Sequence, residues 1–198
     1  MKKIIFPILM FTFIVSTAFA GPFGLSKGMS VGEISKLSEK GGEPARISDD
    51  DRYLFIPKKK HELFKTYVAF IDEEKGLYGI RAISEDIKTT KYGTELKSAF
   101  NSMMERLSKI YGTPKITNKI DPNYYLKKDE YWLTALREGA RELSATWEKG
   151  EKGTNLPEEM GIVSIYVKAN QFFDNGVVII EYDFSNYSEI QEKQDDVL

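Results

Sequence analysis

The stretch DNGVVIIEYDF, residues 174 to 184, decides the fold class of this 198-residue chain. Asp174-Asn175-Gly176 is typical of a tight turn, because Asn and Gly both tolerate positive φ. The run from Val177 to Phe184 is rich in β-branched and aromatic residues, and its second half alternates apolar with acidic side chains. This pattern is typical of a strand with one buried face. We therefore expect a hairpin whose second strand, Val177 to Phe184, closes an antiparallel sheet.

Five further segments show a strand pattern. Alternation is clearest in Arg141–Glu148, where Leu143, Ala145 and Trp147 share the face expected to be buried. The acidic run 72–76 is typical of a hairpin loop between two of the other strands. The remaining expected strands are Tyr53–Ile56, Phe64–Ile71, Leu77–Ile83 and Val163–Ala169.

Four helices are expected between and after these strands. The best marked runs from Thr94, its expected cap, to Tyr111, after which Gly112 and Pro114 prevent continuation. Another begins with a capping box formed by Ser30 and Glu33. Besides the helix that ends at Tyr111, the expected helices are about Val31–Glu39, about Glu130–Ala140 and Ser188–Leu198.

The order of these elements predicts an α+β fold with an antiparallel sheet and helices packed on one side, because no long parallel crossover is apparent. The same order allows two halves, residues 21–112 and 129–198, each a helix plus three strands. A helix and the polar, proline-containing connection Thr113–Lys128 would join them. We expect residues 21–198 to form a single α+β domain.

The first twenty residues have the pattern of a secretory signal peptide. Lys2 and Lys3 precede an apolar run from Ile4 to Val15, and Ala18-Phe19-Ala20 is a small-x-small cleavage site. An uncleaved anchor is the alternative, but the run is short for a membrane span of about 20 residues. We expect a signal peptide over residues 1–20, a cut after Ala20, and a periplasmic or secreted product without a stable membrane anchor.

Composition excludes several classes of function. The chain has no cysteine, so it has neither a lipobox nor disulfides. Without Lys2 and Lys3, 26 basic residues face 30 acidic ones, a formal charge of −4, which argues against nucleic acid as a partner. With no cysteine nucleophile and one histidine, His61, we predict no catalytic residue, no metal site and no cofactor.

Acidic and basic clusters leave alternatives open. Glu181 and Asp183 would share one strand face, where two carboxylates could act in a glycosidase, although an exposed sheet face is the favoured explanation. Asp49–Asp51 could bind calcium or form a solvated turn. Lys58–Lys60 could meet an anionic envelope polymer or a lipid headgroup, but the nearby aspartates would weaken the positive field.

Aromatic residues around the connection between the halves are the predicted binding site. Rings in a polar loop can stack on sugars or anchor a protein interface. The candidate residues are Tyr124, Tyr125, Tyr131 and Trp132. The resulting hypothesis is an exported, non-enzymatic protein that binds another envelope or extracellular protein. The alternatives are a carboxylate-dependent hydrolase of envelope polysaccharide and a secreted enzyme inhibitor.

Two sets of residues resemble known families. Phe23-Gly24-Leu25 followed by Gly28-Met29-Ser30-Val31-Gly32-Glu33-Ile34 is similar to the Gly-Met-Ser/Thr helix start of exported bacterial proteins of the BamE, SmpA and OmlA type, which have a beta-lactamase-inhibitor-like fold. Gly93-Thr94-Glu95-Leu96, Tyr111-Gly112-Thr113-Pro114 and the strand from Ile179 to Asn186 resemble a family of uncharacterised secreted bacterial proteins. The chain departs from the outer-membrane lipoproteins because it lacks the lipobox cysteine, and the resemblance assigns no functional residue.

We expect the exported product to begin at Gly21, because the small side chains of Ala18 and Ala20 suit signal-peptide cleavage. Intact-mass measurement of the product would detect the loss of residues 1–20. Cell fractionation supplies the check. A full-length product that sediments with the inner membrane would contradict cleavage and support an uncleaved anchor.

Overall fold

The computed structural model describes residues 21–47 and 51–195. The expected signal peptide and Asp49 and Asp50 of the acidic cluster lie outside the described residues. The helices are α1 (Val31–Leu37), α2 (Thr94–Tyr111), α3 (Trp132–Arg137) and α4 (Tyr187–Asp195), with short 3-10 turns at Pro22–Gly24, Glu39–Gly41 and Asp129–Tyr131. The strands are β1 (Ala45–Arg46), β2 (Arg52–Phe55), β3 (Phe64–Asp72), β4 (Gly76–Ser84), β5 (Ile87–Lys88), β6 (Lys115–Ile120), β7 (Arg141–Glu148), β8 (Met160–Ala169) and β9 (Asn175–Phe184).

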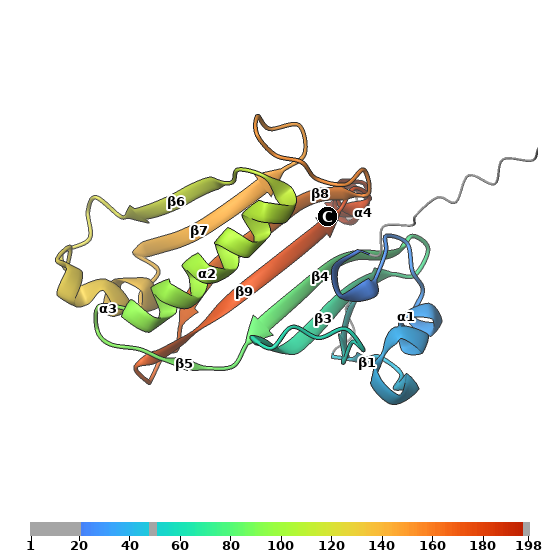
Figure 1. Ribbon diagram of the computed structural model, residues 1–198, viewed down its shortest axis with the longest axis horizontal. Helices are drawn as coiled ribbons and strands as arrows, with labels where there is room; N and C mark the ends of the chain where they lie inside the picture. Colours follow the sequence, from blue (N-terminus) through green and yellow to red (C-terminus); the bar gives the residue numbers. More distant parts are fainter. Residues whose placement is uncertain (1–20, 48–50, 196–198) are drawn as a thin grey trace, which may run out of the picture.

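The described strands form one antiparallel sheet in the order β1-β2-β3-β4-β9-β8-β7-β6, with β5 beside the start of β9. The expected α+β class with an antiparallel sheet is confirmed. Strand β9, the last in the chain, lies between β4 and β8 (Figure 1). Its register places Tyr182 opposite Ile80 on one side and Val163 on the other. The two expected halves therefore contribute strands to a single sheet.

Helix α2 packs across one face of β7, β8 and β9 and creates the main core (Figure 1). The alternation expected from the sequence puts the apolar side chains of these strands on that face, where they are buried. Trp147 is fully buried, and its indole Nε1 donates a hydrogen bond of 2.8 Å to the carbonyl of Gly112, so its polar atom is satisfied. The α2 residues buried in this core are Leu96, Phe100, Met103, Leu107 and Tyr111.

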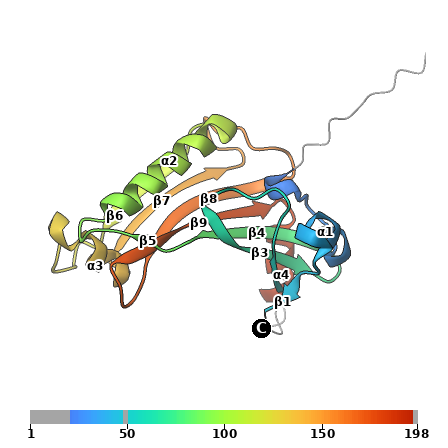
Figure 2. The ribbon, with the colours of Figure 1, turned by 60° about the horizontal axis from the view of Figure 1, so that its bottom comes forward.

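The reverse face of the sheet carries only one helix in the described part of the chain. Figure 2 shows α4 on the opposite side of the sheet from α2. Its Tyr187 ring lies 5.9 Å from the ring of Tyr78, at the β3–β4 end. Strands β7 and β8 and the first part of β9 leave most of this side open, and the end of α3 borders it. We call it the open face, and its residues include Arg81, Ser144, Ser164, Tyr166 and Glu181.

The connection Thr113–Lys128 differs from its prediction, because it contains strand β6. No residue of β6 is buried, because each is exposed or half-buried. Its strand conformation comes from pairing with β7, with Thr117 opposite Ser144. An edge strand of this kind has little hydrophobic pattern of its own.

Several expected boundaries and caps were wrong. Residues Asn175 and Gly176 belong to β9 instead of the turn, which lies at 171–174. Position 176 requires glycine because Leu96 and the Lys168 carbonyl approach it closely. In the sequence, this packing requirement resembles the glycine of a turn. The residue capping α2 is Gly93, with Thr94 inside the helix, and Ser188 likewise lies inside α4.

The other helices are shorter than expected. Helix α1 ends at Leu37, and a 3-10 turn at Glu39–Gly41 replaces its last residues. Helix α3 begins at Trp132 and ends at Arg137, inside the range Glu130–Ala140. The capping box of Ser30 and Glu33 is present, with both reciprocal hydrogen bonds formed.

Gly93→Ala should destabilise the fold. Gly93 has a φ of +68°, and an added Cβ would lie 2.1 Å from the Trp132 ring. We expect the free energy of unfolding to fall by about 2 kcal/mol or more, because strain and steric overlap act together. Urea unfolding measures the change.

Gly32→Ala is the matched control. Gly32 lies inside α1, and no atom lies within 4 Å of the position that an added Cβ would take. Alanine there should raise the free energy of unfolding by about 0.5–1 kcal/mol, because it lowers the entropy of the unfolded chain. Equal effects of the two substitutions would contradict the packing role of Gly93.

Candidate functional site

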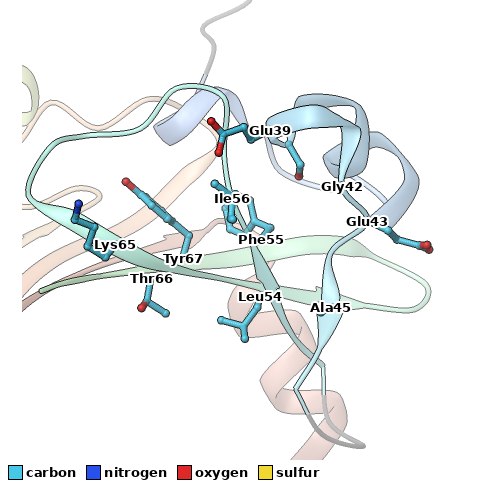
Figure 3. Close-up of a pocket in the computed structure, with 11 residues that line it drawn as sticks. Glu39, Gly42, Glu43, Ala45, Leu54, Phe55, Ile56, Lys65, Thr66 and Tyr67 are labelled. Atoms are coloured by element: carbon cyan, nitrogen blue, oxygen red, sulfur yellow. The ribbon is translucent and has the colours of Figure 1, made fainter.

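Two depressions on the surface are the starting points for a site. The first, of about 370 Å³, lies between the 3-10 turn Glu39–Gly41 and strands β1 to β3 (Figure 3). Its lining is mostly apolar, and Lys60 pairs with Glu39 at 3.1 Å beside it. The Tyr67 hydroxyl is already bonded to the backbone of His61 and Phe64. Two of its polar lining residues, Glu39 and Tyr67, are thus already engaged by neighbours.

The second depression, of about 560 Å³, lies on the open face. We call it the open-face depression. Strands β7, β8 and β9 and the end of α3 line it, so its polar side chains stand on paired strands. Its polar and charged lining residues are Arg137, Arg141, Glu142, Ser144, Thr146, Ser164, Tyr166, Lys168, Gln171 and Glu181.

The two carboxylates that line the open-face depression are both held by neighbours. Arg81 Nε donates to Glu181 Oε1, and the Tyr166 hydroxyl donates to the same oxygen at 3.0 Å. Glu142 forms an ion pair of 2.9 Å with Lys119 and accepts a hydrogen bond of 2.8 Å from Ser144. These hydrogen bonds from Lys119 and Ser144 lower the pKa of Glu142. The carboxylates are thus fixed, charge-compensated acceptors.

The predicted pair Glu181 and Asp183 does share the open face, as both register with β4 residues of that face. Burial raises the pKa of Asp183 to about 6, and repulsion by Glu181 adds to this effect while Arg81 opposes it. However, Asp183 is not among the residues that line the open-face depression. The pair therefore does not converge on this depression.

Glu142 and Glu181 do line one depression, but they stand apart. Glu142 is four residues from Thr146, which lies two strands across from Glu181. Strand geometry gives a separation of about 13 Å along the strands and about 10 Å across them. The Cα atoms of Glu142 and Glu181 are therefore about 16 Å apart. Each carboxylate is held by its own ion pair, Glu142 with Lys119 and Glu181 with Arg81, so the two can serve as fixed acceptors at separate places in the depression.

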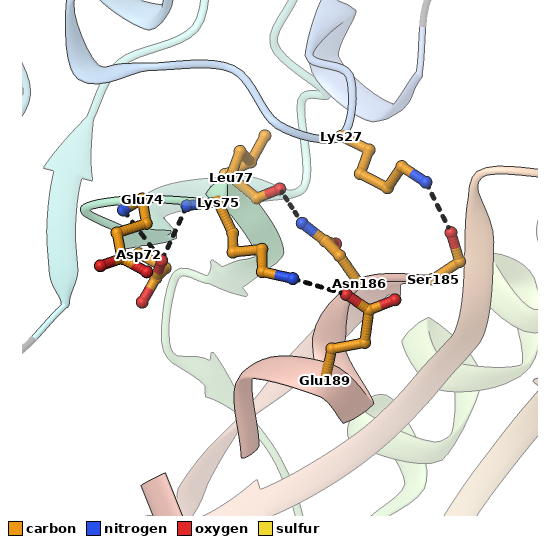
Figure 4. A network of polar contacts seen from close by, with 8 residues as sticks. All are labelled: Lys27, Asp72, Glu74, Lys75, Leu77, Ser185, Asn186 and Glu189. Atoms are coloured by element: carbon orange, nitrogen blue, oxygen red, sulfur yellow. Dashed lines mark hydrogen bonds and ion pairs between the residues drawn. The ribbon is translucent and has the colours of Figure 1, made fainter. Parts of the chain in front are cut away.

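Helix α4 and the residues just before it are held by polar contacts to the β3–β4 hairpin and to Lys27 (Figure 4). Lys75 forms an ion pair of 2.7 Å with Glu189, and Lys27 donates a hydrogen bond of 3.0 Å to Ser185. The buried Asn186 amide donates to the carbonyl of Leu77 at 3.2 Å. The contacts of Lys75 and Leu77 fasten the start of α4 to the β3–β4 hairpin, and the contact of Lys27 holds the end of β9 to the segment before α1.

The predicted aromatic site is divided by the structure. Trp132 is only 2% exposed, and its ring packs against Gly93 and lies 4.4 Å from Lys97 Nζ. Trp132 therefore belongs to the core, because it starts α3 beneath α2, and it cannot contact a partner directly. Tyr131 is half-buried. Tyr125 is 77% exposed, and its ring lies 5.1 Å from that of Tyr124.

Two phenylalanines that the sequence reasoning missed are also exposed. Phe172 and Phe173, in the β8–β9 connection, are 87% and 64% exposed. The sequence signal for Phe172 and Phe173 is a pair of adjacent aromatic residues in an otherwise polar hairpin loop. Arg137 holds this loop, donating to the carbonyls of Asn170 at 2.8 Å and Phe173 at 3.0 Å.

The β6–α3 connection and the β8–β9 connection lie at the same end of the molecule in both views (Figures 1 and 2). We call Tyr124, Tyr125, Phe172 and Phe173 the aromatic end. Tyr124 is oriented by a 2.7 Å hydrogen bond that its hydroxyl donates to Glu138. The loops that carry these rings are thus both fixed to residues at or just after the end of α3, through Arg137 and Glu138.

The His61 ring lies beside a backbone amide and the Arg106 guanidinium. Its Nδ1 accepts from the Leu63 amide at 3.1 Å, and its Nε2 lies 3.0 Å from Arg106 Nη1. Burial and then the Arg106 charge lower the pKa of His61, and the Glu62 charge opposes them.

Comparison with protein-family models, curated proteins and solved structures returns no match to this chain. None of the helices among the described residues is long and apolar enough to cross a membrane. Within residues 21–47 and 51–195, no group of three or more His, Cys, Asp or Glu side chains could hold a metal ion. The site is therefore argued from its own geometry.

Asp183→Asn should stabilise the protein at pH 7.5 and have little effect at pH 4. The pKa of Asp183 is about 6 in the folded state and near 3.9 when unfolded, so the folded state binds the proton more tightly. Its favourable contribution is complete below pH 4 and is lost as the pH rises through 6.

Two pKa units correspond to about 3 kcal/mol, which partial solvent contact reduces to about 2 kcal/mol. Urea unfolding of the unmodified protein and of Asp183→Asn at each pH measures the difference in the free energy of unfolding. The contributions of the other carboxylates are the same in both proteins and cancel. A gain of equal size at pH 4 and pH 7.5 would show that ionisation of Asp183 is not its source.

Proposed function

We propose that this protein is an exported, non-enzymatic binding protein that contacts another envelope or extracellular protein through its aromatic end. The observation that carries the proposal is the exposure of Tyr125, Phe172 and Phe173 at one end of the molecule. Large apolar side chains exposed as a group mark interaction sites more often than isolated ones do. Aromatic residues are also enriched at the centres of protein interfaces.

The rings are presented by loops that are already ordered by the fold. Arg137 bonds the backbone of the β8–β9 connection at two carbonyls, and Glu138 accepts from Tyr124. Binding would therefore cost little additional conformational entropy, which favours affinity.

Charges around the aromatic end are of both signs. Asp174, paired with Arg137 at 3.4 Å, lies in the β8–β9 connection, and Lys127 and Lys128 are exposed in the β6–α3 connection. A mixed polar rim around aromatic side chains is typical of protein interfaces. A polyanion would instead favour a surface of one sign.

The start of the described fold is compatible with the proposed export. The Phe23 ring packs 4.9 Å from Tyr67 and 5.9 Å from Tyr182, so core contacts begin three residues after the expected cut. Removal of residues 1–20 would leave these contacts in place. This supports a folded product that begins at Gly21.

Replacing Phe172 and Phe173 together by Ser should strongly weaken partner capture. The mature protein, immobilised, is used to capture partners from periplasmic extract, with quantification by mass spectrometry. We expect at least about a tenfold loss for the double variant and a similar loss for Tyr125→Ser, because interface aromatics each contribute about 1–2 kcal/mol or more.

Ile110→Ser is the matched control, because Ile110 is an exposed apolar residue of α2, outside the aromatic end. It should retain every partner. If the aromatic variants also retain every partner, the proposal fails. Co-sedimentation with anionic lipid vesicles that the double variant loses would instead assign the aromatic end to a membrane surface and overturn a protein partner.

A further inference from the structure

We propose that strand β6 is a dimerisation edge, to which a second copy of this chain adds its own β6 in antiparallel orientation. The inference uses no residue of the aromatic end. Strand β6 is last in the sheet order, and Figure 1 shows it as the outer strand beside β7. The opposite edge, β1, has two residues, whereas β6 has six. A long edge strand with unpaired backbone groups can pair with another strand.

The β6–β7 ladder shows which backbone groups are unpaired. The amide of Asp121, just after β6, donates to the carbonyl of Ala140 at 2.8 Å and continues the β6–β7 register. In an antiparallel ladder, every second residue bonds to the neighbouring strand, so the odd-numbered residues of β6 bond to β7. The even-numbered residues Ile116, Asn118 and Ile120 therefore point their N–H and C=O groups outward. Among the described strands, none pairs with this outer side.

Two prolines bound the outward row symmetrically. Pro114 and Pro122 are each four residues from Asn118, at even-numbered positions. Proline has no N–H and cannot donate to a ladder. The usable row is therefore centred on Asn118. A two-fold axis through Asn118 uses every outward N–H of the row and forms about six hydrogen bonds between the copies.

The apolar side chains of β6 match each other in this arrangement. Ile116 of one copy lies opposite Ile120 of the other, and this pair occurs twice around the axis. Ile116 is 55% exposed and Ile120 is half-buried. Both lie on the α2 side of the sheet, because Ile116 registers with the buried Ala145 of β7. Cross-strand pairs of β-branched residues stabilise a sheet, and pairing would cover the exposed surface of Ile116.

Charges on the open face favour the same axis. Lys115 of one copy lies opposite Asp121 of the other. Lys119 lies opposite Thr117 and is already compensated by Glu142 at 2.9 Å in its own chain. An axis at Thr117 would set Lys115 against Lys119, and an axis at Lys119 would set that residue against its own copy. Like charges directly opposite each other are destabilising, so both shifted registers are disfavoured.

This symmetry is the reason to infer a second copy and not a peptide of another sequence. An interface on a two-fold axis must be self-complementary. A foreign strand would require neither the equal spacing of the two prolines nor an isoleucine at both matching positions. Edge lysines can also keep other strands away, but here both lysines lie opposite groups that tolerate them in the proposed register.

Sedimentation velocity of the mature protein from about 5 µM to about 1 mM tests the proposal. We expect a reversible equilibrium between monomer and dimer, with a dissociation constant in the micromolar to submillimolar range, because the contact is a single strand pair. A protein that remains monomeric at about 1 mM overturns the proposal.

Variants of β6 locate the contact. Asn118→Pro removes an outward N–H and should weaken the dimer at least about tenfold, because an edge strand tolerates proline where the N–H faces solvent. Ile116→Lys puts a charge opposite Ile120, should have a similar effect, and keeps the test open if Asn118→Pro unfolds. Circular dichroism checks the fold of each variant. Unchanged dimerisation in either folded variant overturns the proposal.

Ile56→Lys is the matched control for Ile116→Lys. Ile56 is 53% exposed and follows β2 near the other edge of the sheet. Its replacement should leave the dissociation constant within about twofold of that of the unmodified protein. An equal loss of dimerisation in Ile56→Lys and Ile116→Lys would overturn a contact confined to β6.

A cysteine on the axis tests the register, because the chain has no other cysteine. The Cα atoms of Asn118 in the two copies should lie about 5.5 Å apart, which suits a disulfide. Asn118→Cys should therefore form a cross-linked dimer on mild oxidation. Lys115→Cys is the matched control, because its own copy would lie about 20 Å away. Equal cross-linking of the two variants overturns the proposed register.

The Phe172→Ser and Phe173→Ser double variant separates this edge from the aromatic end. It should form the dimer as the unmodified protein does, although it is expected to lose partner capture. Loss of the dimer in this variant would place the contact at the aromatic end and overturn the role of β6. Retained partner capture by Asn118→Pro would show that the two surfaces act independently.

Discussion

The pairing of β9 with β4 on one side and β8 on the other is the constraint on which the rest of the structure depends. Tyr182 lies opposite both Ile80 and Val163, so one strand joins residues about 100 positions apart in the chain. A shift of this register by one residue would turn Tyr182 outward and Glu181 into the core. Burial of the apolar side of β9 under α2 therefore determines what the other side presents.

The two faces of the sheet have different chemistry for this reason. On the α2 side, the apolar residues of β7, β8 and β9 pack with Trp147 and Phe100 in one core. On the open face, the same strands place Ser144, Tyr166 and Glu181 in a row of polar groups that α2 does not cover. Helix α4 covers only the part near Tyr78, where Asp183 becomes buried beside it.

Much of the fold was predictable where one face of an element is buried. The strand at 141–148 and the long helix to Tyr111 match their expected ends, because their apolar period follows directly from burial. Strand β6 was not predictable, because an edge strand formed by pairing with β7 carries no such period. The Asp-Asn-Gly turn was misplaced, because a glycine required by close packing resembles a glycine required by a turn.

By itself, the sequence determined the antiparallel α+β class, most strands and the acidic face of β9, because alternation and helical period are local consequences of one-sided burial. Only the tertiary structure decided which rings are at the surface. It buried Trp132 beneath α2, exposed Tyr125, and brought Phe172 and Phe173 to the same end. It also decided that Glu181 lies in a depression and Asp183 outside it. Exposure depends on which segments distant in the chain pack together, and no local pattern encodes that.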